Sequence, residues 1–353
     1  MLLTRRQVFA ATGVVGASMV IGSGQAVAGP KGWETWLAGN RDHVGAVLDD
    51  GRGGRLDHRA QQERILGPAV TAVHAAGYAL AVEQGRVKPD ELVRVGDWEA
   101  YHLGLDGGAH QAALTDLGIP FANGRTADDP DRLVALDDLV KAAVLHGDDA
   151  AADFVRTRVG DATLRAAAVR SGWPAADVRS LGGEALMLVL PGRAPANPAG
   201  RKQVGDALMA QALHDPRLKL EIIGRSPNIP ATSDGRRPWA RQTARGSAAT
   251  LHSLHRSIAG GRFPAARVHL ERAFTGALPP GVRAIGVKGG SLPGALAVAC
   301  AVRWEDGRIG TGVVLAEEVD ERLSTQAGDL FDLTLDSLLD PAALRELRET
   351  LVG

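Results

Sequence analysis

The chain has 353 residues, of which 45% are hydrophobic and 23% charged, and its formal net charge is -1. A chain of this length can bury a large core, as one domain or as two interleaved ones. The near balance of charge argues against a nucleic-acid partner and against attraction to an acidic membrane surface. Aromatic residues make up only 4%, which argues against an interface built on stacked rings.

The first 28 residues have the pattern of an export signal. Thr4-Arg5-Arg6-Gln7-Val8-Phe9 is a twin-arginine pattern, and a small-residue cleavage signal, Ala26-Val27-Ala28, follows the apolar run 8–21. Glycines interrupt this run, which is too weak for a membrane span. We expect export by the twin-arginine route, with Gly29 starting a secreted or wall-associated chain. The alternative is a general secretory signal that contains two arginines by chance.

The next segment predicts two strands and then a helix. Residues 43–48 form a strand candidate that ends in the Asp- and Gly-rich turn 49–54, and residues 55–63 return as the second arm. From residue 70 to 84 apolar residues recur at helical spacing and alanine is frequent, which predicts a helix packed on both sides. Gly85 is a suitable residue to end it.

The middle of the chain is mainly helical. Residues 136–159 show apolar spacing of three and four, with a core helix predicted over 150–155. Proline and glycine cluster at 182–204 and at 224–238, which predicts two long loops.

The last part of the chain returns to strands. Strand-like runs occupy 284–287, 296–304 and 309–316, and Glu305-Asp306-Gly307-Arg308 joins the last two as a hairpin signal. An amphipathic segment rich in leucine follows from 323 to 351.

Strands at both ends and helices between them predict an α+β fold. The simplest assembly is one antiparallel sheet made from both termini, flanked by helices and interrupted by a large inserted helical lobe. The predicted sheet lobe comprises residues 29–65 and 263–353, and the predicted helical lobe comprises residues 66–262. The oligomeric state is left open.

Neither the cysteine nor the closely spaced histidines predict a reactive or metal site. Cys300 is the single cysteine, so no intrachain disulfide can form, and its apolar neighbours predict a buried thiol. His252 and His255 lie three residues apart, but a pair without a third ligand favours surface or core positions. We therefore expect no metal and no cofactor.

Three short segments carry residue types suited to a binding or catalytic cleft. Residues 287–294 read Val-Lys-Gly-Gly-Ser-Leu-Pro-Gly, in which Lys288 offers a charge to a carboxylate. A glycine after it lets a ligand backbone lie along the strand, although a plain glycine-rich turn is the alternative. Residues 145–151 read Leu-His-Gly-Asp-Asp-Ala-Ala, which a simple helix N-cap explains equally well. Residues 68–71, Pro-Ala-Val-Thr, begin the first predicted helix.

These segments resemble the three active-site motifs of class A β-lactamases and penicillin-binding proteins, over residues 40–350. The chain is also similar to an exported, actinobacterial-type branch of this family at residues 77–86, 97–101 and 106–110. By this resemblance, Lys288, Gly289 and Gly290 correspond to the family's Lys-Thr/Ser-Gly motif, and Ser291 could supply the hydroxyl that Gly289 lacks. Gly147, Asp148 and Asp149 correspond to the Ser-Asp-Asn motif. Pro68 and Thr71 correspond to the Ser and the Lys of the Ser-x-x-Lys motif. No Ser-x-x-Lys occurs in the 353 residues.

The resemblance implies a relative without covalent serine chemistry, since loss of the nucleophile costs about a millionfold in kcat. We expect a non-hydrolytic or very weak relative that binds a carboxylate-bearing small molecule or peptide. The expected ligand contacts are Lys288, Gly289, Gly290, Ser291 and Tyr101.

The second hypothesis is a repurposed enzyme that hydrolyses a β-lactam, amide or ester, or performs acyl transfer or cyclisation. Asp148, Asp149 and Lys288 would be its catalytic groups. Glu184 is the nearest candidate for a deacylating carboxylate, with a solvated surface position expected. Whether the chain is an enzyme is left open.

Overall fold

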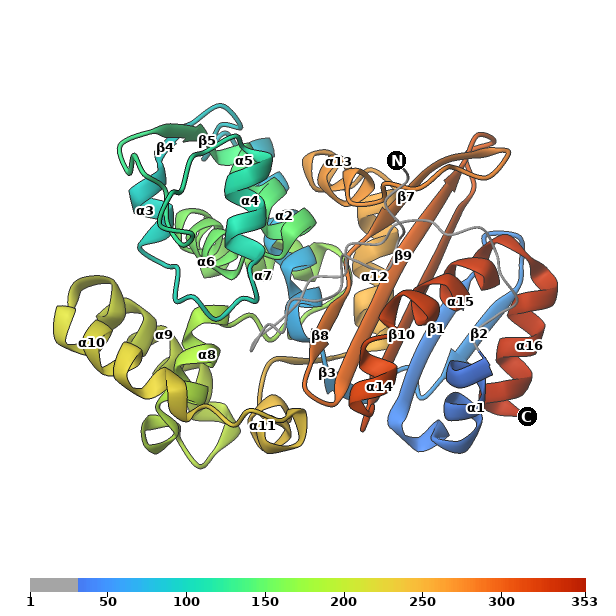
Figure 1. The fold of residues 1–353 in the computed structure, drawn as a ribbon. Helices are drawn as coiled ribbons and strands as arrows, with labels where there is room; N and C mark the ends of the chain where they lie inside the picture. Colours follow the sequence, from blue (N-terminus) through green and yellow to red (C-terminus); the bar gives the residue numbers. More distant parts are fainter. Residues whose placement is uncertain (1–30) are drawn as a thin grey trace, which may run out of the picture.

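The computed structural model describes residues 31–353, so the predicted export signal lies outside the described residues. Figure 1 shows a sheet with helices on its faces beside a region built mainly of helices. Between residues 31 and 353, no helix is long and apolar enough to cross a membrane.

The main sheet takes strands from both ends of the chain, as predicted. Its order is β2-β1-β10-β9-β7, with β8 pairing to β9, and every pair is antiparallel. The strands are β1 (Val44–Asp49), β2 (Arg55–His58), β7 (Val282–Val287), β8 (Gly290–Leu292), β9 (Ala295–Trp304) and β10 (Ile309–Glu317). The predicted hairpin between β9 and β10 is confirmed, and Gly307 supplies its positive φ of 86°. The fold is therefore α+β.

The predicted second arm at 55–63 divides in two. β2 ends at His58, and Arg59 then takes a positive φ of 44°, which interrupts the extended backbone. β3 (Glu63–Ile65) leaves the main sheet and pairs with β6 (Arg245–Ser247). A third small sheet joins β4 (Leu92–Arg94) to β5 (Leu133–Ala135).

Helices cover both faces of the main sheet. The N-terminal α1 (Lys31–Gly39) lies with the C-terminal α14 (Glu321–Ser324), α15 (Ala327–Leu339) and α16 (Pro341–Val352), and α15 packs on β9 and β10 (Figure 1). On the other side, α12 (Ala248–Ala259) packs against β1, β9 and β10, and α13 (Pro264–Arg272) packs against β7. Helix α12 therefore contacts the sheet although it falls within residues 66–262. The division into two lobes stays a prediction.

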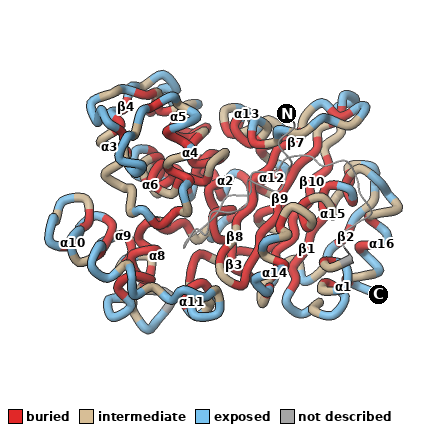
Figure 2. The backbone as a smooth tube through the Cα atoms, in the orientation of Figure 1, coloured by how far each residue is buried: buried red, intermediate tan, exposed pale blue. Residues whose placement is uncertain are grey.

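Helix α2 (Thr71–Glu83) is buried at the centre of the helical region (Figure 2). It packs against α6 (Asp149–Val159), α7 (Asp161–Arg170) and α13. A Cβ added at Gly77 would lie 2.2 Å from Leu164 Cδ2 and 3.2 Å from Leu164 Cα, so a larger residue there would force Leu164 to shift. The predicted end of the helix is confirmed, since Gly85 follows it with a φ of 66°.

The remaining helices surround α2 or extend away from it. They are α3 (Val95–Glu99), α4 (Ala109–Asp116), α5 (Leu136–Lys141), α8 (Leu181–Val189), α9 (Pro198–His214), α10 (Pro216–Arg225) and α11 (Ser233–Ala240). Short helical turns occupy η2 (Arg41–His43), η3 (Gly67–Val70), η4 (Ala142–His146), η5 (Pro191–Arg193) and η6 (Ser226–Asn228). The helical spacing over 136–159 corresponds to α5, the π-helical η4 and α6, with a break at Gly147, whose φ is 72°. The core helix predicted over 150–155 is confirmed within α6.

The two proline- and glycine-rich segments hold helices, so the prediction of long loops is wrong. Residues 182–204 belong largely to α8 and α9, and residues 224–238 reach into α11. Side-chain caps begin these helices, since Ser180 Oγ accepts from Gly183 N at 2.7 Å and Asn197 Oδ1 from Gly200 N at 3.0 Å. Proline is tolerated in a first helical turn because no N–H is needed there.

Candidate functional site

The three motif segments meet at the N-terminal end of α2. Pro68 lies in η3, directly before α2, and Gly290 opens the neighbouring strand β8. A Cβ added at Gly290 would lie 2.6 Å from Ala69 N and 2.8 Å from Pro68 N. This glycine therefore lets β8 contact the protein's own backbone. The expected ligand contacts of Gly289 and Gly290 stay predictions.

Lys288 is buried, with 3% of its surface exposed, and its partners include backbone carbonyls. Its Nζ donates to Val144 O at 3.2 Å and to Ala143 O at 3.4 Å, both in η4. A π-helical turn leaves carbonyl groups without the usual helical partners, so the ammonium satisfies them. Burial lowers the pKa of Lys288 to about 8, with Asp149 opposing the shift. A ligand contact by Lys288 stays a prediction.

Gly289 and Ser291 flank Gly290 at this end of the sheet. Gly289 is buried between β7 and β8, whereas Ser291 is partly exposed on β8. Gly67 lies opposite, where an added Cβ would be 3.7 Å from Ser291 N. Ser291 is thus near the start of the first motif, although it does not line the cavity described below.

Asp148 caps α6 and is fully buried. Its Oδ1 accepts from Ala151 N at 2.9 Å, and its Oδ2 lies 2.9 Å from His110 Nδ1. Gly147 precedes it and takes the positive φ that turns the chain into α6. The N-cap explanation of this motif is therefore confirmed. Both carboxylate oxygens have partners away from the cavity, which argues against Asp148 as an acid or base.

A buried network on α3 and α4 holds Asp148 in place. His110 lies between Asp148 and Glu99, whose Oε1 is 3.2 Å from His110 Nε2. Although burial lowers the pKa of His110, the hydrogen bonds to Asp148 and Glu99 raise it to about 9. His102 stacks on His110 with ring centroids 4.1 Å apart, and burial followed by the charge of His110 lowers the pKa of His102 to about 4. The segment 97–110 thus braces the second motif.

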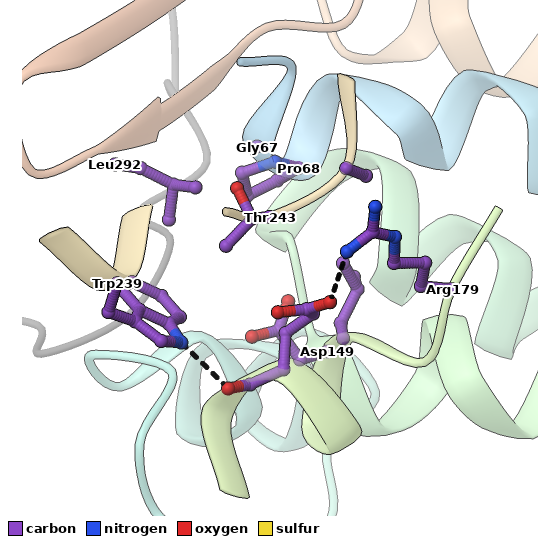
Figure 3. A pocket seen from close by; sticks show the side chains of 10 residues that line it. Gly67, Pro68, Asp149, Arg179, Trp239, Thr243 and Leu292 are labelled. Carbon is purple, nitrogen blue, oxygen red and sulfur yellow. Dashed lines mark hydrogen bonds and ion pairs between the residues drawn. The ribbon is translucent and has the colours of Figure 1, made fainter. Parts of the chain in front are cut away.

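A small cavity of about 30 Å³ lies beside Pro68. Figure 3 shows Leu292 and Trp239 on one side of it and Arg179 on the other. The complete lining is Gly67, Pro68, Asp149, Arg179, Leu181, Glu184, Trp239, Thr243, Ala244 and Leu292. Pockets for drug-sized ligands have volumes of about 300–1,000 Å³, whereas this one has room for one or two waters.

Asp149 is the one predicted catalytic residue that lines this cavity, where it is partly exposed. Burial raises its pKa well above the ordinary range, and the charges of Asp106, Asp153 and Asp148 raise it further. Lys288 opposes this shift. This shift favours the protonated carboxyl, which has an O–H donor beside its remaining acceptor oxygen.

Glu184 also lines the cavity, so the expectation of a solvated surface position is wrong. It is 5% exposed, its Oε1 accepts from Arg179 Nη1 at 2.8 Å, and its Oε2 accepts from Arg201 Nη2 at 2.9 Å. Trp239 Nε1 donates to the backbone oxygen of Glu184 at 2.8 Å. A carboxylate with both oxygens held by guanidinium groups is poorly placed to activate water.

Tyr101 and Thr71 lie away from the cavity. Tyr101 packs edge-on against Phe154, with ring centroids 6.0 Å apart, and lines separate hollows. Thr71 is 1% exposed on α2, and one turn further His74 is buried with no hydrogen-bond partner for either ring nitrogen among residues 31–353. Burial lowers the pKa of His74 to about 3, which keeps the ring neutral.

Sequence reasoning missed two charged or aromatic residues of the cavity, Arg179 in the loop before α8 and Trp239 in α11. It also missed Arg201, the second arginine on Glu184. The available signal was an arginine five residues before Glu184, within a glycine-rich stretch.

No group of three or more metal-ligating side chains could hold a metal ion within the described part of the chain. His252 and His255 are buried on α12, which packs against the sheet. Cys300 is buried in β9, and burial raises the pKa of its thiol to about 12, so the predicted buried thiol is confirmed.

Comparisons with known proteins give likenesses in structure. No protein-family model and no curated protein matches the sequence. A β-lactamase from Sphaerobacter thermophilus is 14% identical with a TM-score of 0.54, and the match covers 86% of this chain and 96% of that one. A β-lactamase from Chitinophaga pinensis is 15% identical, with a TM-score of 0.54 and coverage of 88% and 98%. The TLA-3 extended-spectrum β-lactamase is 10% identical, with a TM-score of 0.52 and coverage of 91% and 100%. At these identities the likeness concerns the fold, and the predicted fold is confirmed.

Proposed function

We propose that this chain, which has the β-lactamase/transpeptidase-like fold, is a non-acylating protein that binds a carboxylate-bearing small molecule or peptide without hydrolysing it. The observation that carries the proposal is Pro68 at the start of α2, beside Gly290, where the resemblance requires a serine. A proline has no hydroxyl to attack a carbonyl. Thr71, three residues further along the chain, has no amine and cannot act as the base that the lysine of the motif provides.

The charges around the cavity support the same proposal. Lys288 donates to η4 carbonyls, Asp148 caps α6, and Glu184 is held by two arginines. In an enzyme, groups that move protons need to meet the substrate within hydrogen-bond reach. Here internal partners hold these three side chains, which favours a structural role for the former catalytic centre.

A specific observation favours the repurposed enzyme as a second candidate. Asp149 lines the cavity with its pKa raised well above the ordinary range, as a general acid requires. If Asp149 is the general acid of such an enzyme, the Asp149→Asn variant should lose activity while its fold stays intact. An unchanged rate in that variant, measured on any ester or amide that the protein hydrolyses, would remove this candidate.

Incubation with a fluorescent penicillin tests the absence of acylation. We expect no labelled band and no mass increase in the intact protein, because no nucleophile lies at Pro68. The double variant Pro68→Ser with Thr71→Lys is the matched control, and slow labelling there would show that the cavity admits the probe. A penicilloyl adduct on any residue of the natural chain contradicts the proposal.

The predicted role of Lys288 has its own test. If Lys288 contacts the ligand, Lys288→Ala should weaken binding of an acyl-D-Ala-D-Ala peptide by about 1.5–3 kcal/mol, the scale of a charge-assisted hydrogen bond. Calorimetry on both proteins measures the difference. Equal affinities together with a lower melting temperature of the variant would mean that Lys288 is structural.

Export by the twin-arginine route is also part of the proposal, because of the pattern at residues 4–9. Replacing both Arg5 and Arg6 with lysine should retain the precursor inside the cell, as judged by fractionation. Unchanged export of that variant would favour the general secretory route.

A further inference from the structure

Positive charge is concentrated in one segment of an otherwise acidic chain. Residues 191–245 contain ten Lys and Arg but four Asp and Glu, a formal charge of +6. The rest of the chain contains 30 Lys and Arg and 37 Asp and Glu, a formal charge of -7. The segment forms η5, α9, α10, η6 and α11, which lie together with α8 in Figure 1. A local excess of this size attracts anions to this part of the surface.

These elements enclose an apolar groove of about 520 Å³, which we call the basic-lobe groove. Met187, Leu188 and Val189 of α8 line it, together with Trp239 of α11. Its volume lies in the range of pockets that bind drug-sized molecules, in contrast to the cavity at Pro68. Trp239 lines both spaces and so separates them.

The charged groups of the groove are arginines. Arg201 and Arg225 line it, and no Asp or Glu does so among the described residues. Arg201 is 2% exposed and is held by internal partners, since its Nη2 donates to Glu184 Oε2 at 2.9 Å and its Nη1 to Gln242 Oε1 at 3.1 Å. The accessible charge of the groove is therefore that of Arg225, which is exposed. Arg225 Nε pairs with Glu221 Oε1 at 3.1 Å, but Glu221 Oε2 is shared with Arg193 at 2.5 Å. One carboxylate therefore serves two guanidinium groups, which leaves excess positive charge at the mouth.

The walls of the groove are stiff before any ligand arrives. Pro191, Pro195, Pro230 and Pro238 line it, and each fixes its own φ angle. Ordering flexible walls on binding costs free energy, so pre-formed walls favour tight binding of a small molecule.

We infer that the basic-lobe groove is the ligand site, and that it binds a small amphipathic molecule with an apolar body and one carboxylate. The inference rests on the proposed function and deepens it, since it locates the carboxylate ligand away from Pro68. The apolar body lies on α8 and Trp239, and the carboxylate meets Arg225.

Binding of 1-naphthylacetate, measured by calorimetry, tests the inference, with the neutral 1-naphthylacetamide as its matched probe. We expect the carboxylate to bind about tenfold more tightly, because only it pairs with a guanidinium. Arg225→Gln should weaken 1-naphthylacetate roughly three- to tenfold, as for a partly exposed charge. Arg217→Gln is the control, since it also loses an exposed positive charge of α10 but does not line the groove. We expect no change in its affinity beyond twofold.

A blocking variant keeps the test independent of charge. Ala196 lines the groove and is exposed, so Ala196→Trp should fill the space, keep the natural melting temperature and lower affinity at least about tenfold. Equal binding of both probes, or natural affinity in Ala196→Trp, overturns the inference. If Lys288→Ala loses binding while Ala196→Trp does not, the groove is wrong and the proposed function stands. If penicillin labels the natural chain, the proposed function fails whatever the groove binds.

Discussion

The cavity at Pro68 and the basic-lobe groove share Trp239 but differ in how their charges are used. In the cavity wall, Glu184 binds two arginines, and the space left is about 30 Å³. The groove has about 520 Å³, apolar walls and the exposed Arg225, whose partner Glu221 is shared with Arg193. Buried charges that find internal partners stabilise a fold, whereas an open apolar space with excess charge suits a ligand. The comparison therefore separates a structural centre from a candidate binding site on either side of Trp239.

The largest effect should come from Glu184→Ala. The change leaves Arg201 buried without a carboxylate, while Arg179 keeps Asp177, and it costs about 3–5 kcal/mol of unfolding free energy. Glu221→Ala is the control, because Glu221 pairs with Arg193 and Arg225 at the surface and its loss should cost under about 1 kcal/mol. Urea denaturation measures both. Similar losses in the two variants would remove the contrast between cavity and groove.

Gly290→Ala should have the next largest effect. The added Cβ would lie 2.6 Å from a backbone nitrogen, which cannot move aside as a flexible side chain does. We expect a loss of about 1–3 kcal/mol, as for an overpacked core. Gly328→Ala is the control, since its Cβ meets nothing within 4 Å, and it should be neutral or stabilise α15 by up to about 1 kcal/mol. An unchanged melting temperature in Gly290→Ala would mean that β8 does not pack tightly on η3.

Asp149→Asn should change how stability depends on pH. The pKa of Asp149 is higher in the folded chain than in the unfolded one, so the folded state binds more protons above pH about 4. Its contribution to stability therefore falls as pH rises through that value. We expect the variant to match the natural chain near pH 4 and to be increasingly more stable towards pH 8. Urea unfolding across this range measures the difference.

Asp306→Asn is the control for this pH series. Asp306 is exposed in the hairpin between β9 and β10, where the backbone hydrogen bond from Arg308 lowers the pKa of its carboxyl. Its removal should give no gain in stability with rising pH. If Asp149→Asn behaves like Asp306→Asn, the carboxyl at the cavity is ionised and the general-acid candidate loses its support.

The smallest effects on stability should come from the groove. Arg225→Gln and Ala196→Trp change exposed side chains, so each should alter the unfolding free energy by less than about 0.5 kcal/mol. The same denaturation series measures them. A loss above about 2 kcal/mol in either variant would mean that the groove is part of the structural core.

Local pattern was sufficient for much of the fold. The β9–β10 hairpin follows from two apolar runs around Asp306 and Gly307, and α2 follows from helical spacing that ends at Gly85. The buried state of Cys300 follows from its apolar neighbours. The prediction of loops for the two proline- and glycine-rich segments was wrong, because side-chain caps such as Ser180 and Asn197 allow helices to begin there.

The sequence by itself determined that the chain contains no Ser-x-x-Lys, and its resemblance predicts that Pro68 and Thr71 stand where covalent chemistry needs Ser and Lys. Only the tertiary structure decided which partners the charged side chains near this position have. Glu184 meets Arg201 across 17 residues and Trp239 across 55, and Lys288 meets Val144 across 144. Such pairs leave no local signature, because a side chain's partner is set by how helices and strands pack and not by its neighbours along the chain. Burial then fixes which charges stay paired and which carboxyl, at Asp149, is favoured in its neutral form.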